Sequence, residues 1–217
     1  MGVGGFKYLN KFLDDYPSMS INHCSIKGVH LSGKFNFTTC VANKNKITDS
    51  YKLEIIIPEN FPHAIPILKE IGGKIPRNGN YHVNPDGSLC LGSPLRLLLK
   101  INNSSDLSTF IDKCLVPYLY AISYKLKYGG NWIFGELAHG EEGIIDDYSN
   151  IFGLKERSQV VQALNMLGVK KRIANKNPCP CGCGKKLGNC SFHNKLNKYR
   201  ELAPTSWFKK QKLNIVN

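Results

Sequence analysis

The sequence predicts an α+β protein in which helices flank a four-stranded antiparallel sheet and a small cysteine-rich module follows near the C-terminal end. One helical pattern precedes four β-like runs, and further helical patterns follow them, an order typical of segregated α+β folds. Short connections between the first three runs favour an antiparallel meander. Four cysteines and one histidine lie within fifteen residues close to the end of the chain.

Apolar periodicity predicts three helices. The first covers residues 6–16 and ends before a proline. The second covers residues 106–128, where apolar side chains form a wide face and Pro117 is expected to bend the helix. The third covers residues 156–167 and ends at Gly168.

Four β-like runs lie between the first two helices. They cover residues 24–31, 34–42, 50–57 and 67–75. Gly33 separates the first two runs, and the prolines of residues 58–66 exclude a helix or a central strand before the fourth. Residues 76–94 contain three glycines and lack apolar periodicity, so we expect a long ordered loop there.

The composition is that of a globular protein outside the membrane. Apolar residues make up 42% and charged residues 21% of the 217 residues, and no apolar run approaches the length of a membrane span. The first dozen residues lack the apolar core of a signal peptide. We therefore expect a cytoplasmic protein without a membrane partner, whose eight cysteines do not form a disulfide scaffold.

Positive charge is concentrated in the last fifty residues. The chain carries a net charge of +13, and residues 169–217 contain 12 Lys or Arg and a single acid. Such a segment is typical of a solvated tail or of an arm that meets an acidic surface or nucleic acid. Few aromatic residues are interleaved with the charges and no groove-reading helix pattern is present, so we expect an acidic partner surface rather than nucleic acid.

The cysteine cluster has the composition of a structural zinc site. Zinc prefers four thiolate or imidazole ligands in a tetrahedron, and glycines between the cysteines let the backbone wrap an ion. Five side chains compete for four positions, and we expect the ligands Cys179, Cys181, Cys190 and His193, with Cys183 as alternate or bystander. No His/Glu pair suited to an open catalytic site lies nearby. The metal is therefore expected to supply folding energy to a segment without a core.

The same segment resembles the SEC-C motif. That motif has the form CPCGSGKK followed by a Cys and then an adjacent Cys or His, and here CPCGCGKK is followed by Cys190 and, three residues later, His193. Cys183 stands where the motif has Ser. The resemblance implies a small zinc-bound docking module that serves protein contacts.

Cys90 is the candidate nucleophile of the chain. It follows a tight turn at Asp86 and Gly87, and its small polar neighbours leave the sulfur reachable. His82 and Asn84 precede it across the turn, where either can offer an N–H to a developing oxyanion. The cysteines on apolar faces are expected to pack in the core: Cys24, Cys40 and Cys114.

The segments around Cys90 resemble the ubiquitin-conjugating (UBC) fold. Residues 58–66 read Pro-x-x-Phe-Pro-x-x-x-Pro where the family has Pro-x-x-Tyr-Pro-x-x-x-Pro, and residues 87–91 are similar to the family's active-cysteine segment. His82 and Asn84 keep the first and last residues of the family's HPN tripeptide at a shifted spacing, and we rank His82 slightly above Asn84 as oxyanion donor. The resemblance implies a UBC-like meander flanked by helices.

These resemblances imply four segments. They are a ubiquitin-conjugating-like catalytic domain over residues 1–155, a helix and linker over 156–176, the zinc module over 177–193 and a basic tail over 194–217. Residues 130–148 resemble the tail of prokaryotic ubiquitin-conjugating-like proteins. Within that stretch we expect Trp132 and Phe134 in the core and His139 as a loop residue rather than a neighbour of the cysteine.

The resemblance also implies a function. Such prokaryotic proteins are typically encoded in antiphage operons of the CBASS type, beside a cGAS-like nucleotidyltransferase. Cys90 is then expected to carry the C-terminus of that enzyme, or of a ubiquitin-like protein, as a thioester and to transfer it to an amine of an acceptor protein. The alternative is a non-catalytic UBC-fold adaptor with a zinc docking module. Such adaptors usually lose the cysteine, so Cys90 favours the transferase.

Overall fold

The computed structural model of the chain describes all residues except 1–6, 27, 42–43, 136–139 and 216–217. The chain forms two compact units, within residues 1–136 and 137–217, and each is described by itself. Residue 155, the expected end of the catalytic domain, falls inside the second unit, together with the expected zinc module and basic tail. In the described part of the chain, no helix has both the length and the apolar character needed to cross a membrane.

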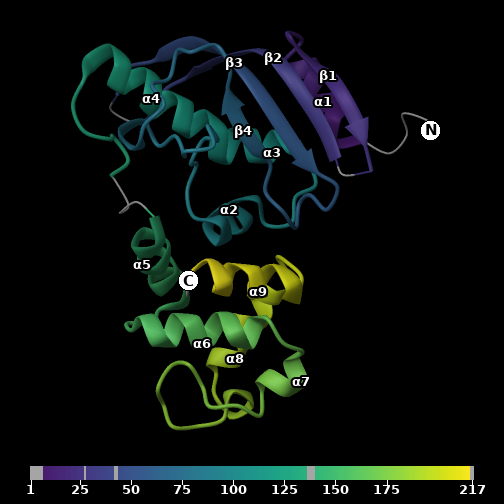
Figure 1. Cartoon of the computed structure of the whole chain (residues 1–217), viewed down its shortest axis with the longest axis vertical. Helices are drawn as coiled ribbons and strands as arrows, with labels where there is room; N and C mark the ends of the chain where they lie inside the picture. Colours follow the sequence, from purple (N-terminus) through teal and green to yellow (C-terminus); the bar gives the residue numbers. More distant parts are fainter. Residues whose placement is uncertain (1–6, 27, 42–43, 136–139, 216–217) are drawn as a thin grey trace. The chain divides into compact units, whose positions relative to one another are not determined.

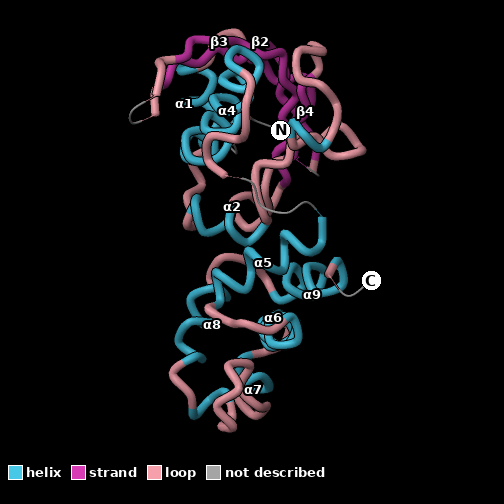
Figure 2. The backbone as a smooth tube through the Cα atoms, turned by 90° about the vertical axis from the view of Figure 1, so that its left-hand side faces the viewer, coloured by secondary structure: helices cyan, strands magenta, loops and turns pink. Residues whose placement is uncertain are grey.

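The first unit is built on a four-stranded antiparallel sheet with strand order β1-β2-β3-β4. Its elements are α1 (Lys7–Asp15), β1 (Met19–Ser25), β2 (Gly28–Thr39), β3 (Ile47–Pro58), β4 (Ile67–Glu70), η2 (Gly79–Tyr81), α2 (Pro94–Ile101), α3 (Leu107–Phe110), η3 (Ile111–Leu115) and α4 (Val116–Tyr128). Helices α1 and α4 lie on one face of the curved sheet (Figures 1 and 2). The predicted α+β class and the four-stranded antiparallel meander are confirmed.

The core of the first unit lies between the sheet and these helices. Leu53, Ile55 and Ile57 of β3 alternate toward the helices and are fully buried. Burying each such side chain contributes about 1.5–3 kcal/mol of hydrophobic stabilisation. On the opposite face, Lys34 of β2 and Lys52 of β3 are register partners with exposed side chains. The sheet therefore has one apolar and one polar face, as is common for antiparallel sheets.

Strands β1 and β2 differ from the sequence prediction. Gly33 does not separate two strands, because β2 runs through it without a break, and β1 pairs with β2 from Ser25 and Gly28 onward. Gly33 has a φ of 152°, and a Cβ at this position would lie 2.1 Å from the carbonyl oxygen of Ser18. The glycine thus permits a close approach of the chain that precedes β1. The fourth strand ends at Glu70, five residues earlier than predicted.

The predicted helix over residues 106–128 is present as α3, η3 and α4 in direct succession. It begins at Asp106, whose carboxylate accepts from the Ser108 N–H at 2.9 Å. The middle part, η3, is a π-helical turn in which the Val116 N–H donates to the Ile111 carbonyl. Pro117 lacks an N–H, and its ring would clash with the carbonyl four residues earlier in a regular α-helix. The expected distortion at Pro117 therefore takes the form of a wider turn just before it.

The second unit is a small helical assembly around one central helix. Its elements are α5 (Gly140–Phe152), α6 (Arg157–Leu167), α7 (Lys171–Ala174), η4 (Leu187–Asn189), α8 (Phe192–Arg200) and α9 (Thr205–Asn214). Helix α6, which confirms the predicted helix over 156–167, packs against α5, α7, α8 and α9. Its apolar face is fully buried: Val160, Ala163, Leu164 and Leu167.

The expected basic tail is folded. Most of residues 194–217 belong to α8 and α9, and Phe208 in α9 is fully buried. Tyr148 of α5 donates its hydroxyl to Gln211 of α9 at 3.0 Å. The Arg200 guanidinium donates to the carbonyls of Met166 and Val169, at 2.5 and 2.8 Å, and so satisfies acceptors at the end of α6. This segment is therefore part of a packed unit and not an extended arm.

Candidate functional site

The segment that contains Cys90 is a short hairpin on the outer edge of β4. The Leu89 N–H donates to the Leu68 carbonyl at 2.8 Å, which joins the hairpin to the sheet. Val83 and Leu89 face each other across the hairpin and are both buried. The predicted ordered loop over residues 76–94 therefore contains a small antiparallel pair, held by the sheet and by its own apolar contact.

The turn of this hairpin is held by side-chain hydrogen bonds. Asp86 accepts from the backbone N–H of Ser88 at 3.0 Å and from its hydroxyl at 2.6 Å. These bonds hold the pKa of the Asp86 carboxyl below its usual range. Asn84 donates its side-chain N–H to the Ser88 hydroxyl at 3.0 Å. The carboxamide of Asn84 is therefore engaged at the turn.

Cys90 lies directly across the hairpin from His82. Its backbone N–H donates to the His82 carbonyl at 2.8 Å, next to the Val83–Leu89 pair. The Cys90 side chain is half-buried. Three residues later Ser93 caps the start of α2, where its hydroxyl accepts from the Arg96 N–H at 3.4 Å. Cys90 thus occupies the connection between a fixed hairpin and a capped helix.

Trp132 and Tyr118 contact the residues that precede the hairpin. The His82 ring meets Trp132 edge to face, with ring centroids 4.3 Å apart. Trp132 donates its indole N–H to the Asn80 carbonyl at 3.1 Å. Tyr118 of α4 donates its hydroxyl to the Tyr81 carbonyl at 2.9 Å, and burial raises the pKa of Tyr118. These contacts fix the backbone that leads into His82.

The structure places Cys90 and His82 opposite each other across the hairpin, with a backbone hydrogen bond between them, and Asn84 at the turn. Sequence reasoning missed α2 and the roles of Tyr118 and Trp132, although the Ser-Pro start of α2 is a helix signal. Trp132 is half-buried, but the expectation that Phe134 lies in the core is wrong because its side chain is 51% exposed. His139 lies outside the described residues.

Of the three cysteines expected to pack in the core, only Cys114 does so. Burial raises the pKa of its thiol to about 11. The prediction was wrong for Cys24 and Cys40, which are exposed. Cys24 lies in β1, an edge strand whose side chains are mostly exposed.

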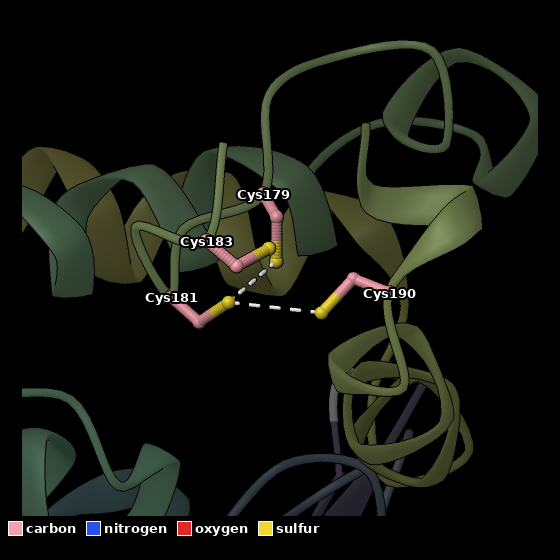
Figure 3. A group of neighbouring side chains, drawn as sticks. All are labelled: Cys179, Cys181, Cys183 and Cys190. Atoms are coloured by element: carbon pink, nitrogen blue, oxygen red, sulfur yellow. Dashed lines mark hydrogen bonds between the residues drawn. The ribbon is translucent and has the colours of Figure 1, made fainter. Parts of the chain in front are cut away.

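Four cysteines of the second unit form a compact cluster. The Sγ atoms of Cys179, Cys181, Cys183 and Cys190 all lie within 4.8 Å of one another. Figure 3 shows the four side chains converging from the loop after α7 and from the end of η4. Gly182 and Gly184 have φ values of 78° and 74°, which turn the backbone on both sides of Cys183. The loop therefore presents three thiols from alternate positions to a fourth.

The spacing of the sulfurs fits a metal ion. Zinc bound to four thiolates at about 2.3 Å in a tetrahedron places neighbouring sulfurs about 3.8 Å apart. The Sγ atoms of Cys181 and Cys190 are 3.6 Å apart, and those of Cys179 and Cys181 are 3.2 Å apart. Burial raises the pKa of Cys179 and of Cys181, whereas the Phe192 backbone N–H lowers the pKa of Cys190 to about 7. A metal would therefore displace protons from the buried thiols as it binds.

The expected ligand His193 stands outside this cluster, and Cys183 takes its place. His193 lies in the first turn of α8, and its Nδ1 is 2.7 Å from the Cys190 carbonyl oxygen. The two glycines around Cys183 bring that thiol inward instead. Cys183, which the sequence predicts as alternate or bystander, is marked in the sequence by the glycine on each side of it.

Comparison of the chain with protein-family models, with curated proteins and with solved structures gives no match. The function is therefore inferred from the hairpin and the cysteine cluster.

Proposed function

We propose that the chain is a ubiquitin-conjugating-like cysteine transferase that carries a protein C-terminus on Cys90. The observation that carries the proposal is the position of Cys90, which is half-buried and bonded through its backbone N–H to His82 at the edge of the sheet. A fixed hairpin holds the sulfur in place, and partial exposure leaves it open to a partner's C-terminus. The order of helix, antiparallel meander, hairpin and helix supports the same family.

The chemistry consists of two acyl transfers. The Cys90 thiolate attacks the carbonyl carbon of a C-terminus that a partner supplies as an activated ester or anhydride; a C–S bond forms and the partner's leaving group departs. An amine of the acceptor then attacks the thioester, a C–N bond forms, and the sulfur leaves as thiolate while the amine proton passes to solvent. Each step passes through a tetrahedral oxyanion.

His82 is the proposed donor to that oxyanion. It is the cross-strand neighbour of Cys90, whereas the Asn84 carboxamide already donates to Ser88. An N–H aimed at the developing charge contributes about 3–4 kcal/mol to lowering the barrier. Trp132 packs against the His82 ring, which limits its motion. We assign Trp132 as a positioning residue.

The cysteine cluster is proposed to hold a structural zinc ion. All four positions of a tetrahedron are filled by thiols of the chain, so no position is left open for a substrate. Free thiols at both sites require reducing conditions, and the proposal therefore includes a cytoplasmic location. We further propose, from the resemblance to proteins of CBASS-type antiphage operons, that the loaded C-terminus belongs to a cGAS-like nucleotidyltransferase or to a ubiquitin-like protein.

The test is co-expression of the full chain with the products of its neighbouring genes. The wild-type protein is expected to form a protein adduct that a thiol reductant removes. Cys90→Ser is expected to convert the thioester into an ester that resists the reductant, and Cys90→Ala to form no adduct. The double variant Cys24→Ser/Cys40→Ser, which alters two exposed cysteines, serves as the matched control and should behave like wild type.

An adduct that persists in Cys90→Ala, or no adduct on the wild-type chain, would overturn the transferase. The chain would then be better described as a UBC-fold adaptor with a metal-binding docking module.

A further inference from the structure

Six cationic side chains of the second unit gather around α7 and the cysteine loop. They form what we call the basic face: Lys170, Lys171, Arg172, Lys176, Lys185 and Lys186. All six are exposed. Helix α7 and the loop lie together at the end of the second unit that is far from α5 (Figures 1 and 2).

Backbone hydrogen bonds bring the two halves of the basic face together. The Cys179 N–H donates to the Lys185 carbonyl at 2.9 Å, and the Leu187 N–H donates to the Asn177 carbonyl at 2.8 Å. Pro178 and Lys186 form an antiparallel bridge between these bonds. The lysines of the loop therefore lie beside the chain that leaves α7, although about ten residues separate them in sequence.

The charge of the basic face is not compensated by acids. Residues 157–200 contain no Asp or Glu. Glu141 and Glu142 of α5 both form ion pairs with Arg157 at the start of α6, away from the basic face. Within the part of the chain that the structure describes, none of the six side chains of the basic face forms an ion pair. Four of the six acids of the second unit thus lie in α5, whereas the cations of the basic face gather around α7.

The chemistry of the face fits phosphate groups better than a protein surface. Protein interfaces are enriched in aromatic residues and depleted of Lys at their cores. Residues 169–191 contain no aromatic residue, and Ile173, which is 49% exposed, is the large apolar side chain exposed on α7. Binding of single strands also depends on aromatic stacking. The backbone of a nucleic acid duplex requires only cations in register with phosphates.

We propose that the basic face binds the phosphate backbone of double-stranded nucleic acid without reading its sequence. The scarcity of aromatic residues led us to expect a protein partner from the sequence. It excludes stacking of the bases of a single strand, but it does not exclude contact with the backbone of a duplex. This proposal is independent of the proposed function of Cys90, because all six residues of the basic face lie in the second unit.

The test is binding of the full-length protein to labelled duplexes of random sequence, followed by fluorescence anisotropy over a salt series. Duplex DNA and duplex RNA form separate arms that identify the source of the phosphates, and polyglutamate forms a third. If six phosphates are contacted, log K falls with log salt with a slope of about −5, so affinity drops about a thousandfold between about 50 and 200 mM salt.

Paired variants separate the basic face from the overall charge of the protein. Lys185→Gln/Lys186→Gln is expected to reduce the slope by about 2, because each lost phosphate contact removes about one unit. Lys34→Gln/Lys52→Gln changes the net charge equally on the exposed face of the sheet and should leave the slope unchanged. Circular dichroism checks that both variants are folded.

Binding to either duplex with this difference between the two variants supports the proposal. It is overturned if neither duplex binds at low salt, if both double variants lose affinity equally, or if polyglutamate binds as tightly as the duplexes.

Discussion

Cys90, Cys114 and Cys183 carry the same thiol in three different surroundings. Cys114 lies in η3 and is buried, and burial raises its pKa to about 11, so it remains protonated and inert at neutral pH. Cys183 lies among three other thiols that converge on one point. Cys90 alone combines partial exposure with a cross-strand histidine. The role of each cysteine thus follows from its neighbours.

Substitution of the proposed oxyanion donor should slow transfer without preventing folding. His82→Ala is expected to reduce the rate of thioester discharge to an amine about 10²-fold, because one N–H donor to the tetrahedral oxyanion is lost. His82→Asn keeps an N–H and should recover part of the rate. Single-turnover discharge measures both variants.

Asn84→Ala is the matched comparison for His82. It removes a hydrogen bond to Ser88 at the turn and should change the discharge rate less than tenfold. A hundredfold loss in Asn84→Ala together with a normal rate in His82→Ala would contradict the assignment and identify Asn84 as the donor.

The identity of the fourth metal ligand can be tested by two single substitutions. Cys183→Ser should weaken zinc binding at least about tenfold, because a hydroxyl replaces one of four thiolates. His193→Ala should leave the affinity nearly unchanged, because its Nδ1 lies against the Cys190 carbonyl and outside the thiol cluster. Competition with a chromophoric chelator measures both affinities, and the opposite ranking would restore His193 as the ligand.

At the scale of elements, a chain of polar side chains joins β3 to α4. The Tyr51 hydroxyl lies 2.6 Å from the Ser123 hydroxyl, which donates to Asp49 at 2.8 Å. Lys74 forms an ion pair with Asp49 on the solvent side. Burial would by itself raise the pKa of Asp49, but hydrogen bonds from Lys74 and Ser123 outweigh it and hold the pKa below its usual range. This link ties the sheet to the helix that also carries Tyr118.

The lowered pKa of Asp49 predicts a pH-dependent contribution to stability. Such a carboxyl stabilises the fold above its unfolded pKa of about 3.9 and loses this contribution as the pH falls through the lower folded value. Asp49→Asn should therefore cost about 1 kcal/mol at about pH 7 and less at about pH 3.

Urea unfolding at the two pH values measures the effect of Asp49→Asn. Asp14→Asn, which alters an exposed carboxylate of α1, is the control and should change the free energy of unfolding little at either pH. An equal cost of Asp49→Asn at both pH values would show that the charge of Asp49 is not what stabilises the link.

The sequence predicted the elements that have a clear local pattern. It missed those that are determined by contacts with residues far away in the sequence. Helix α6 was predicted from its periodicity and its stop at Gly168. Gly33 suggested a turn, but the reason for the glycine is the Ser18 carbonyl, which no local pattern reveals. Helix α9 was missed because the apolar residues that pack it, such as Phe208, are sparse among lysines.

In the candidate sites, too, the sequence predicted the residues that are close together in the chain and not the contacts made by distant residues. The thiol cluster was predicted from the sequence, with His193 ranked above the alternate Cys183 as its fourth member. The order was wrong because backbone φ values at Gly182 and Gly184 decide which side chain faces the other thiols. Cys90 and His82 were singled out together, but the contacts of Tyr118 and Trp132 come from sequence positions about thirty to fifty residues away.

At the scale of the whole molecule, the two units are stabilised in different ways. The first has a sheet and helices around an extensive apolar core. In the second unit, the cysteine loop is attached to α6 by a hydrogen bond, which the Gln162 side chain donates to the Pro178 carbonyl at 3.1 Å. A metal in the cluster would tie the chain after α7 to the start of α8. Metal removal should therefore affect the second unit selectively.

The two tryptophans allow this to be measured, because Trp132 lies in the first unit and Trp207 in the second. A strong chelator should lower the unfolding free energy reported by Trp207 by about 4 kcal/mol, as expected when free metal exceeds its Kd about a thousandfold. The transition reported by Trp132 should not move. Trp132→Phe and Trp207→Phe isolate the two signals, and a chelator effect of equal size on both would contradict a local role for the metal.

The chemical nature of the bond at Cys90 is the most direct test. Intact mass spectrometry of the chain, co-expressed with its genomic neighbours and kept free of reductant, measures the adduct before and after neutral hydroxylamine. Hydroxylamine cleaves a thioester but leaves a disulfide intact. The transferase predicts a protein adduct that hydroxylamine removes and that is absent from Cys90→Ala. An adduct that resists hydroxylamine and yields only to a thiol reductant would be a disulfide and would contradict it.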